Sequence, residues 1–297
     1  MFAHDPICYQ DIELAQKRIS VKRLDLIHPT ICGNKWFKLQ PNLQAAEQAG
    51  KSTIISFGGA YSNHIHALAH ACAERGLHSV GIIRGQELAQ RPLNPTLQDA
   101  LDVGMQLQFI SRQAYRQKHT QDYLNALQDA YPDAYIVPEG GSNRLAVTAC
   151  EAILSADDVQ NFDVIVCAVG TGATFAGIVN ASDAKRQQVL GFAALNSNHL
   201  SHSIQAWLKD QRRNWQIQAD VTFGGYGKIA APLQDLIDAC AQQHLPLEPV
   251  YTAKALYGLK QHLQRNAIAA EQRILFVHTG GLQGARGFNR SETTEMC

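Results

Sequence analysis

A repeated local pattern constrains the fold of this chain more than any other feature: a short β-rich run, a glycine-containing turn and then a helical pattern. Residues 53–57 fit a strand, and after the next turn apolar residues recur at helical spacing up to a stop at Gly76. Residues 164–168 form a continuous apolar run, as expected of a strand covered on both faces. Strands that alternate with helices predict an α/β fold with mostly parallel sheets under helical cover.

Two lobes are expected from the number of these units in a chain of 297 residues, which is long enough for a sizeable core. We predict a smaller α/β lobe at residues 42–147 and a larger lobe formed by residues 1–41 plus 148–297. Ligands of open α/β sheets bind beyond the carboxyl ends of strands, where three glycine-rich loops follow Phe57, Ala168 and His278. The other expected strands are 79–83, 107–110, 135–137, 189–193, 221–223 and 274–277, with helices near 96–103 and from about 174.

Composition argues against several classes of protein. Lys plus Arg and Asp plus Glu both number 26, and this balance does not favour binding to nucleic acid or to an anionic membrane. No apolar run approaches the ~20 residues of a membrane span, and the first ten residues do not resemble a signal peptide. The seven cysteines are odd in number and lack a CxxC pair, so we expect reduced thiols in a cytoplasmic protein.

The loop at residues 169–177 follows a buried-type strand and opens a predicted helix. Its glycines let the backbone approach a ligand, and the N–H groups at a helix N-terminus favour a phosphate. Thr171 and Thr174 add hydroxyl donors. A tight turn without a ligand explains the loop equally well. A dinucleotide site is a further alternative, although the G-x-G-x4-G spacing differs from the G-x-G-x-x-G pattern.

The loop at residues 56–64 is a second strand–turn–helix junction. Amides at Ser62, Asn63 and His64 would suit a substrate carboxylate, and Ser62 could also act as an acid or a nucleophile. The alternative is that Ser62 or Asn63 only caps the helix. His66 and His70 have the spacing of a metal-binding pair, but no neighbouring carboxylate or Cys completes a site, so we expect no metal.

Lys35 stands between Asn34 and two aromatic residues, Trp36 and Phe37. Desolvation by these neighbours would lower the pKa of the Lys35 ammonium group and free its amine for Schiff-base chemistry. Lys38, one helical turn further on, could offset the charge of a phosphate. The alternative interpretation is a lysine on a helix surface, where most isolated lysines lie.

Three further side chains could contribute to the same site. Thr279 follows the strand at 274–277 and could form a hydrogen bond with a ring nitrogen, although a hydroxyl does not pair with a pyridinium as a carboxylate would. Tyr226 and Tyr251 could stack on a ligand or donate a proton. The alternative for Thr279 is a loop hydroxyl that binds the backbone, and the alternative for the two tyrosines is packing alone.

Seven segments of the chain, in order, together resemble one known family. They are Gly33-Asn34-Lys35, Gly58-Gly59-x-x-Ser62-Asn63-His64, Pro138-Glu139-Gly140-Gly141-Ser142-Asn143, residues 169–177, Gly225-Tyr226-Gly227, Pro249-Val250-Tyr251-Thr252-x-Lys254 and His278-Thr279-Gly280-Gly281. Over nearly the whole chain they resemble fold-type-II enzymes that depend on pyridoxal 5′-phosphate (PLP), specifically the 1-aminocyclopropane-1-carboxylate deaminase/D-cysteine desulfhydrase family. The resemblance implies two lobes, each a mostly parallel twisted sheet covered by helices, with PLP bound in the larger lobe of a homodimer.

The same resemblance assigns residues to the cofactor. Lys35 matches the lysine that forms a Schiff base with PLP, and Lys38 matches a basic residue near the phosphate. Asn63 matches the asparagine that contacts the PLP ring oxygen, and Thr279 matches the ring-nitrogen partner of desulfhydrase-like members. The phosphate loop is matched by Gly170, Thr171, Gly172, Ala173 and Thr174.

Substrate residues are assigned in the same way. Ser62 matches the active-site serine, and Tyr226 and Tyr251 match the tyrosines beside the substrate. The substrate-binding segment would comprise Tyr61, Ser62, Asn63 and His64. Family members usually have Gln at the position of Tyr61, so this bulkier side chain leaves the identity of the small amino-acid substrate open.

Two positions bear on the reaction. The resemblance implies that deaminases of the family carry Tyr-Glu where this chain has Tyr251-Thr252, and an apolar residue where it has Thr279. Without that Glu the ring nitrogen is expected to stay unprotonated and the ring is a weaker electron sink, which suits elimination of a good leaving group. We therefore expect a D-cysteine desulfhydrase-like lyase that converts D-cysteine to pyruvate, sulfide and ammonia by α,β-elimination. The alternatives are a deaminase or racemase on the same scaffold and a module that binds PLP or a phosphorylated ligand without turnover.

Overall fold

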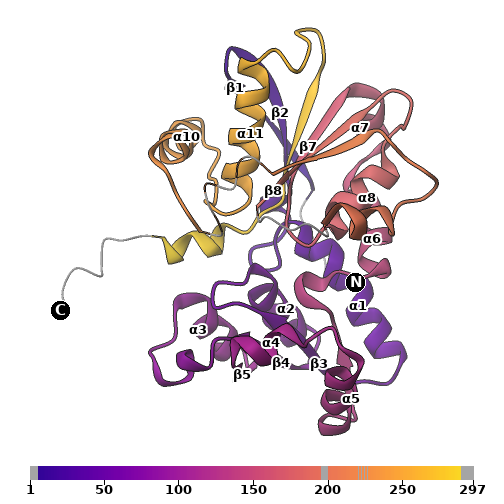
Figure 1. The fold of residues 1–297 in the computed structure, drawn as a ribbon, viewed down its shortest axis with the longest axis vertical. Coiled ribbons are helices and arrows are strands. Elements are labelled where there is room, and N and C mark those ends of the chain that lie inside the picture. Colours follow the sequence, from indigo (N-terminus) through magenta and orange to yellow (C-terminus); the bar gives the residue numbers. More distant parts are fainter. Residues whose placement is uncertain are drawn as a thin grey trace, which may run out of the picture.

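The computed structural model describes residues 6–194, 200–219, 221, 223, 225 and 227–288. In this part of the chain two lobes lie one above the other, each with a twisted sheet and helices on its faces (Figure 1). The larger sheet has the strand order β1-β2-β10-β7-β8-β9, and the smaller sheet has the order β5-β4-β3-β6. Every strand pair is parallel except β1 with β2. The predicted α/β fold with mostly parallel sheets is confirmed.

The larger lobe is built around β7, whose six residues are all buried. Ile165, Cys167 and Val169 face one apolar cluster, and the alternate residues of β7 face the other. Its strands are β1 (Cys8–Leu14), β2 (Lys17–Arg23), β7 (Val164–Val169), β8 (Gln188–Ala193), β9 (Trp215–Gln218) and β10 (Ile274–His278). Its helices are α6 (Arg144–Cys150), α7 (Ala156–Asn161), α8 (Ala173–Ala181), α9 (Leu200–Gln205), α10 (Ala231–Gln242) and α11 (Thr252–Gln264). Helices α6 and α8 cover one face of the sheet, and α10 and α11 cover the other.

The smaller lobe repeats this layered design. Ile54 packs with α2 and α3, whereas Ile55 and Phe57 pack on the opposite face with Tyr115 of α4 and Leu127 of α5. Its strands are β3 (Thr53–Gly58), β4 (His78–Arg84), β5 (Gln106–Ile110) and β6 (Ala134–Ile136). Its helices are α2 (Asn63–Glu74), α3 (Pro95–Asp102), α4 (Arg112–Arg116) and α5 (Gln121–Ala130).

Helix α1 (Asn34–Gln48) connects the two lobes. It packs against α6 and against α2, so one apolar cluster runs from the smaller sheet through α1 to the larger sheet. Short 3-10 helices occur at η1 (Leu24–Leu26), η2 (Gln86–Gln90), η3 (Glu139–Gly141), η4 (Glu151–Ile153) and η5 (Leu282–Gly287). The lobe boundaries at residues 42–147 stay a prediction.

One expected strand is wrong and three strands, β1, β2 and β9, were not anticipated. Val221 and Phe223 lie in turns, and Phe223 has a φ of 52°, which a β-strand does not accommodate. The strand of that region is β9, which comes earlier in the chain. The hairpin of β1 and β2 has no turn signal in the sequence, because its turn residues, Ala15 and Gln16, adopt positive φ without the usual Gly or Asn. Within the described ranges, every helix falls short of the length and apolar character that a membrane crossing needs.

Candidate active site

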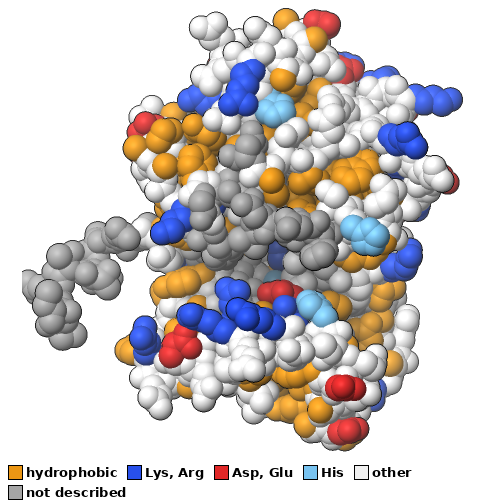
Figure 2. All heavy atoms as spheres, in the orientation of Figure 1, with side chains coloured by type: hydrophobic (Ala, Val, Ile, Leu, Met, Phe, Trp, Pro, Cys, Tyr) orange, Lys and Arg blue, Asp and Glu red, His pale blue; other side chains and the backbone are white. Residues whose placement is uncertain are grey.

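A cavity of about 400 Å³ lies where the loops after β3, β7 and β10 meet the start of α1. In Figure 2, basic, acidic and histidine side chains gather along the rim of the smaller lobe that faces the larger lobe. The three glycine-rich loops singled out from the sequence thus meet at one cavity. This convergence follows from the parallel sheets, because each loop leaves the carboxyl end of its strand.

Lys35 is the second residue of α1, and its position is set by Gly33. Gly33 has a φ of 68°, and any Cβ atom there would overlap the carbonyl group of Thr279. The Asn34 backbone N–H donates to the Thr279 carbonyl oxygen over 3.1 Å. Only glycine permits this approach, which brings the start of α1 against the loop after β10.

The Lys35 amine lies among polar groups at the cavity. Its Nζ donates to Asn34 Oδ1 over 2.9 Å, and Asn34 Nδ2 in turn donates to Thr174 Oγ1 over 2.8 Å. Burial lowers the pKa of Lys35 below the ordinary lysine value. A lysine with a lowered pKa spends more time as the neutral amine, the form that attacks a carbonyl carbon.

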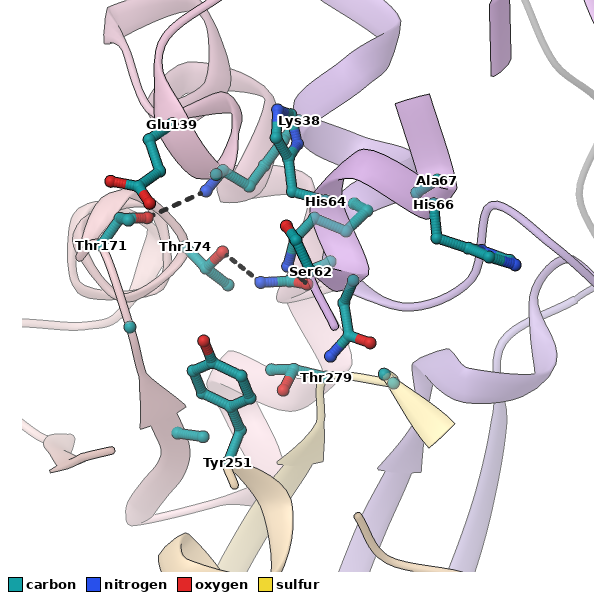
Figure 3. Close-up of a pocket in the computed structure, with 18 of the residues that line it drawn as sticks. Lys38, Ser62, His64, His66, Ala67, Glu139, Thr171, Thr174, Tyr251 and Thr279 are labelled. Atoms are coloured by element: carbon teal, nitrogen blue, oxygen red, sulfur yellow. Dashed lines mark hydrogen bonds between the residues drawn. The ribbon is translucent and has the colours of Figure 1, made fainter. Parts of the chain in front are cut away.

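Lys38 lies at one end of the cavity. Its side chain is 2% exposed, and Nζ donates to Ser142 Oγ over 2.7 Å and to Thr171 Oγ1 over 3.4 Å. Figure 3 shows Lys38 pointing toward Thr171, with Glu139 nearby. Burial, assisted by the charge of Lys35, lowers the pKa of Lys38 to about 7. Ser142 was not among the predicted site residues, although it belongs to one of the matched segments.

The loop from Gly170 to Thr174 lies at the same end of the cavity and leads into α8. The first backbone N–H groups of a helix have no partner within it, so they are available to an anion. A buried lysine, two hydroxyls and these N–H groups form a donor-rich pocket that fits a phosphate. The donor set thus suits the anionic group predicted from the sequence.

Ser62 lies at the cavity and also caps α2, because its Oγ accepts a hydrogen bond from the Ile65 N–H over 3.3 Å. His64 is buried, with Nε2 2.7 Å from Ser56 Oγ. Burial places the pKa of His64 well below the usual histidine value, so this ring is neutral. Tyr61 lines the cavity, and its ring lies against Gly287. Asn63 also lines the cavity.

Thr279 and Tyr251 lie across the cavity from Lys38 (Figure 3). The Tyr251 ring packs against Gly170, where an added Cβ atom would come within 3.1 Å of the ring. The structure thus brings the predicted site residues together at the cavity, with two exceptions. Ala173 is buried in the apolar core and does not line the cavity, and Tyr226 lies outside the described residues. The roles assigned to these residues stay predictions.

A buried ionic cluster, missed in the sequence, supports the loop that carries Thr279. Asp25 accepts hydrogen bonds from Arg23 Nε over 2.9 Å and from an Arg23 terminal nitrogen over 2.6 Å. The His278 Nδ1 atom lies 3.1 Å from Asp25 Oδ1. Burial alone would raise the pKa of Asp25, but the hydrogen bonds with Arg23 and His278 outweigh it and hold this pKa well below its usual value. The carboxylate therefore stays ionised and fixes the end of β10.

Carboxylates at the cavity are already engaged by other groups. Among the described residues that line it, Glu139 is the acidic one, and it accepts a hydrogen bond from Tyr115 over 2.6 Å and lies 3.2 Å from Lys118 Nζ. Glu248 is buried nearby, but its carboxyl oxygens accept from the backbone N–H groups of residues 250–252. Burial raises the pKa of Glu248, which these N–H donors oppose.

The histidine pair does not form part of a recognisable metal centre. His66 Nε2 lies 3.1 Å from Asp99 Oδ2, and the rings of His66 and His70 are 4.6 Å apart. The described residues hold no group of three or more His, Cys, Asp or Glu side chains that could bind a metal ion. The carboxylate partner of His66 comes from α3, far from it in the sequence.

Two parallel-sheet lobes, with a lysine amine and a donor-rich glycine loop at one cavity between them, define a PLP-dependent enzyme of fold type II. The family model described as "Pyridoxal-phosphate dependent enzyme" matches residues 10–280, and the chain belongs to this family. The cofactor of the family is pyridoxal 5′-phosphate, as predicted.

Individual relatives agree with this assignment. A putative 1-aminocyclopropane-1-carboxylate deaminase of Thermotoga maritima is 30% identical over 285 residues, covering 90% of this chain and 89% of the relative. The bifunctional D-cysteine desulfhydrase/1-aminocyclopropane-1-carboxylate deaminase of Arabidopsis thaliana, a mitochondrial protein, is 30% identical over 290 residues, covering 89% and 72%. A crystal structure of an ACC deaminase homologue superimposes with a TM-score of 0.79 at 25% identity, covering 96% of this chain and 91% of that chain. The resemblance stated from the sequence is confirmed.

Proposed function

We propose that this protein is a lyase that performs α,β-elimination on a small amino acid, with D-cysteine as the expected substrate. The reaction would consume D-cysteine and water and release pyruvate, hydrogen sulfide and ammonia. Its C–S bond breaks with the electron pair leaving on sulfur, so no oxidant is needed. When bound, PLP stabilises the negative charge that develops at the substrate α-carbon.

The residues of the cavity would hold the cofactor at three places. Lys35 Nζ would bind its aldehyde carbon, and Lys38 with the loop from Gly170 to Thr174 would hold its phosphate. Asn63 would contact the ring oxygen, and Thr279 the ring nitrogen. The buried, donor-rich end beside Lys38 supports this orientation, because a phosphate needs both charge and N–H donors.

Proton transfer would be shared between Lys35 and the hydroxyls of the cavity. The Lys35 amine would accept the substrate α-proton, and burial lowers the pKa of Lys35, which favours the neutral amine that can accept a proton. Ser62, Tyr251 or Tyr226 would handle the second proton. General acid–base catalysis of this kind contributes roughly 10²- to 10⁴-fold to a rate.

The observation that carries the choice of elimination is the hydroxyl of Thr279. Glu139 is engaged by Tyr115 and Lys118 at the other end of the cavity, and Glu248 is turned toward the backbone of α11. A ring nitrogen beside Thr279 would therefore face a hydroxyl, which does not favour a protonated ring. Elimination of a good leaving group requires less stabilisation of charge at the α-carbon than opening a cyclopropane ring.

Deamination of 1-aminocyclopropane-1-carboxylate is the second candidate, and the name of the Thermotoga relative favours it. The Thermotoga relative is named for this activity alone, and the Arabidopsis relative is named for both. A racemase or deaminase of another small amino acid would use the same residues. A module that binds PLP or a phosphorylated ligand without turnover is the non-enzymatic alternative.

Product analysis would separate these candidates. The purified protein would be incubated in turn with D-cysteine, D-serine and 1-aminocyclopropane-1-carboxylate, and pyruvate, 2-oxobutanoate, sulfide and ammonia measured. Sulfide and pyruvate from D-cysteine would support the desulfhydrase, whereas 2-oxobutanoate from the cyclopropane substrate would support the deaminase. A binding module would give no product from any of them.

The Lys35→Ala variant tests the mechanism itself. The wild-type protein should have a visible absorbance band that borohydride removes, and the variant should lack this band and all turnover. Lys185→Met, at an exposed lysine, is the matched control and should keep both. Full activity in Lys35→Ala would contradict the mechanism.

We also propose that the protein is a homodimer in the cytoplasm, as the family resemblance implies. The six described cysteines are unpaired, which is compatible with a reducing compartment. Light scattering on the eluting protein would give its mass in solution, and a mass of one chain would exclude the dimer. Fractionation of cells that express the tagged full chain would test the compartment.

A further inference from the structure

The side-chain amide of Gln283, in η5, lies between two donors and one acceptor. Its Oε1 atom accepts from the Thr96 hydroxyl over 2.8 Å and from an Arg286 terminal nitrogen over 3.3 Å. A guanidinium group carries donors only, so the amide atom beside Arg286 must be the oxygen. The nitrogen of the same amide therefore points the other way, toward α2.

Asp99 holds Arg286 in this place. Asp99 Oδ2 accepts from the Arg286 terminal nitrogen over 2.6 Å and lies 3.1 Å from His66 Nε2. Hydrogen bonds with Arg286 and His66 outweigh burial and lower the pKa of Asp99, so its charge persists at neutral pH. A fixed carboxylate thus fixes the guanidinium group, which in turn fixes the orientation of Gln283.

Gln283 passes this orientation on to Asn63. The Gln283 Nε2 atom donates to Asn63 Oδ1, and a Cβ atom added at Gly284 would lie 3.0 Å from the same oxygen. The amide nitrogen of Asn63 therefore lies on the other side, where a Cβ atom at Gly281 would come within 2.5 Å of it. Gly281 also has a φ of 90°, so glycine is needed there on both grounds.

The last donor of the series, the Asn63 amide nitrogen, lies beside Gly281, which lines the same cavity. Asn63 lines the cavity, and its Nδ2 atom forms no hydrogen bond with any described residue, whereas its Oδ1 atom is occupied by Gln283. A pocket that presents an N–H donor suits an oxygen that carries negative charge, such as the ionised ring oxygen of PLP.

We propose that Thr96, Gln283 and Asn63 form a polarised hydrogen-bond relay that holds the Asn63 amide with its N–H₂ group toward the cofactor, and that Gln283 is therefore a positioning residue for PLP. The inference rests on the cofactor site proposed above. It adds a second effect, because Thr96 and Asp99 belong to α3 of the smaller lobe and Gln283 and Arg286 follow β10 of the larger lobe. The same bonds that orient Asn63 hold the lobes together beside the cavity, near the segment drawn in yellow in Figure 1.

The variant Gln283→Glu tests the relay with little change in shape. A carboxylate can accept from Thr96 and Arg286, but at neutral pH it has no donor for Asn63, so the Asn63 amide would turn its oxygen toward the cavity. Gln283→Ala removes the side chain, and Gln90→Glu, at an exposed residue of η2, controls for the added charge. Cofactor-free protein would be titrated with PLP, and the dissociation constant taken from the visible band.

We expect PLP to bind about 10- to 100-fold more weakly to Gln283→Glu, the range for one hydrogen bond to a charged oxygen, and unchanged to Gln90→Glu. In an Asn63→Ala background, Gln283→Glu should weaken binding no further, because the relay acts only through Asn63. The cofactor-free Gln283→Glu protein should keep its secondary structure by circular dichroism.

Two results would overturn the relay while leaving the cofactor site intact: unchanged affinity in Gln283→Glu, or equal losses with and without the Asn63 side chain. The second result would assign Gln283 a structural role only. Absence of the visible band in the wild-type protein would instead refute the cofactor site itself.

Discussion

The charge of Lys38 leads to a prediction about how cofactor affinity depends on pH. Its side chain is 2% exposed and its pKa is lowered to about 7, chiefly by burial. A bound phosphate favours the protonated amine, so affinity is highest below this pKa and falls as the pH rises through it. The affinity stops falling above the pKa that Lys38 has in the complex, where the bound state loses the same proton.

The size of the effect follows from the pKa. A lysine with a pKa of about 7 is half protonated at pH 7 and about 1% protonated at pH 9. If Lys38 stays charged in the complex over this interval, the affinity should fall about 50-fold, or about 2.3 kcal/mol. Phosphate monoesters have a second pKa of about 6, so the ligand itself remains mostly a dianion throughout.

The assay requires a ligand that does not react with Lys35. We would use 4-deoxypyridoxine 5′-phosphate, which keeps the ring and the phosphate but lacks the aldehyde, and measure its dissociation constant by calorimetry from pH 6 to 9. Lys38→Met should bind more weakly at pH 6 and show a flatter profile, whereas Lys185→Met, at an exposed lysine, should match the wild type.

The role of Lys38 is tested by comparing the pH dependence of the dissociation constant in the wild type and in Lys38→Met. Titration of Lys35 contributes to both profiles, so only the difference between them reports on Lys38. Equal slopes in wild type and Lys38→Met would refute the role of Lys38 at the phosphate. Lys38→Met should remain folded, because it replaces a buried amine by an apolar side chain. The melting temperature of the cofactor-free variant should be equal to or higher than that of the wild type.

Three further substitutions test the framework of the site. Ser62→Ala should slow turnover and, through loss of the α2 cap, lower the free energy of unfolding by about 1 kcal/mol in urea; unchanged kcat would exclude Ser62 from catalysis. Gly33→Ala should reduce PLP loading, measured from the visible band, because φ is 68° and Thr279 blocks a Cβ atom; full loading would contradict this. Asp25→Asn should lower stability by about 3–5 kcal/mol, because Arg23 loses its buried carboxylate; an unchanged unfolding midpoint would show that the cluster contributes little.

The parts of the site that the sequence could predict are those set by local rules. Gly170–Thr174 and the loop from Gly58 to His64 each follow a strand and open a helix, so their place at the carboxyl edge of a parallel sheet needed no long-range information. Lys35 was identified by its match to the Schiff-base lysine of the family, because its neighbours in the chain alone also fit a lysine on a helix surface. The strand β7 could also be predicted, because a strand covered on both faces has a continuous apolar sequence.

The parts that could not be predicted depend on contacts between distant segments. Ser142 meets Lys38 across 104 positions, and Gln283 meets Asn63 across 220, and neither pairing has a periodic signal. The β1–β2 hairpin has a regular alternation in Ile12, Leu14, Ile19 and Val21, but the Ala15-Gln16 turn concealed it. Asp25 lies two residues after Arg23 in the chain, and only the fold brings this pair to His278.

The charges around the cavity explain why the protein should depend on its cofactor for stability. Lys35 and Lys38 are both desolvated, and they lie close enough together that the charge of Lys35 lowers the pKa of Lys38. The buried carboxylate of Glu248 is bound by backbone N–H groups rather than by either lysine. An anionic phosphate would supply the missing negative charge. Binding to the folded state alone stabilises it by about 2.7 kcal/mol at a ligand concentration 100 times the dissociation constant. Because Lys38 lies on α1, which joins the lobes, and the phosphate loop lies on the larger lobe, this gain should appear in the unfolding of both lobes together.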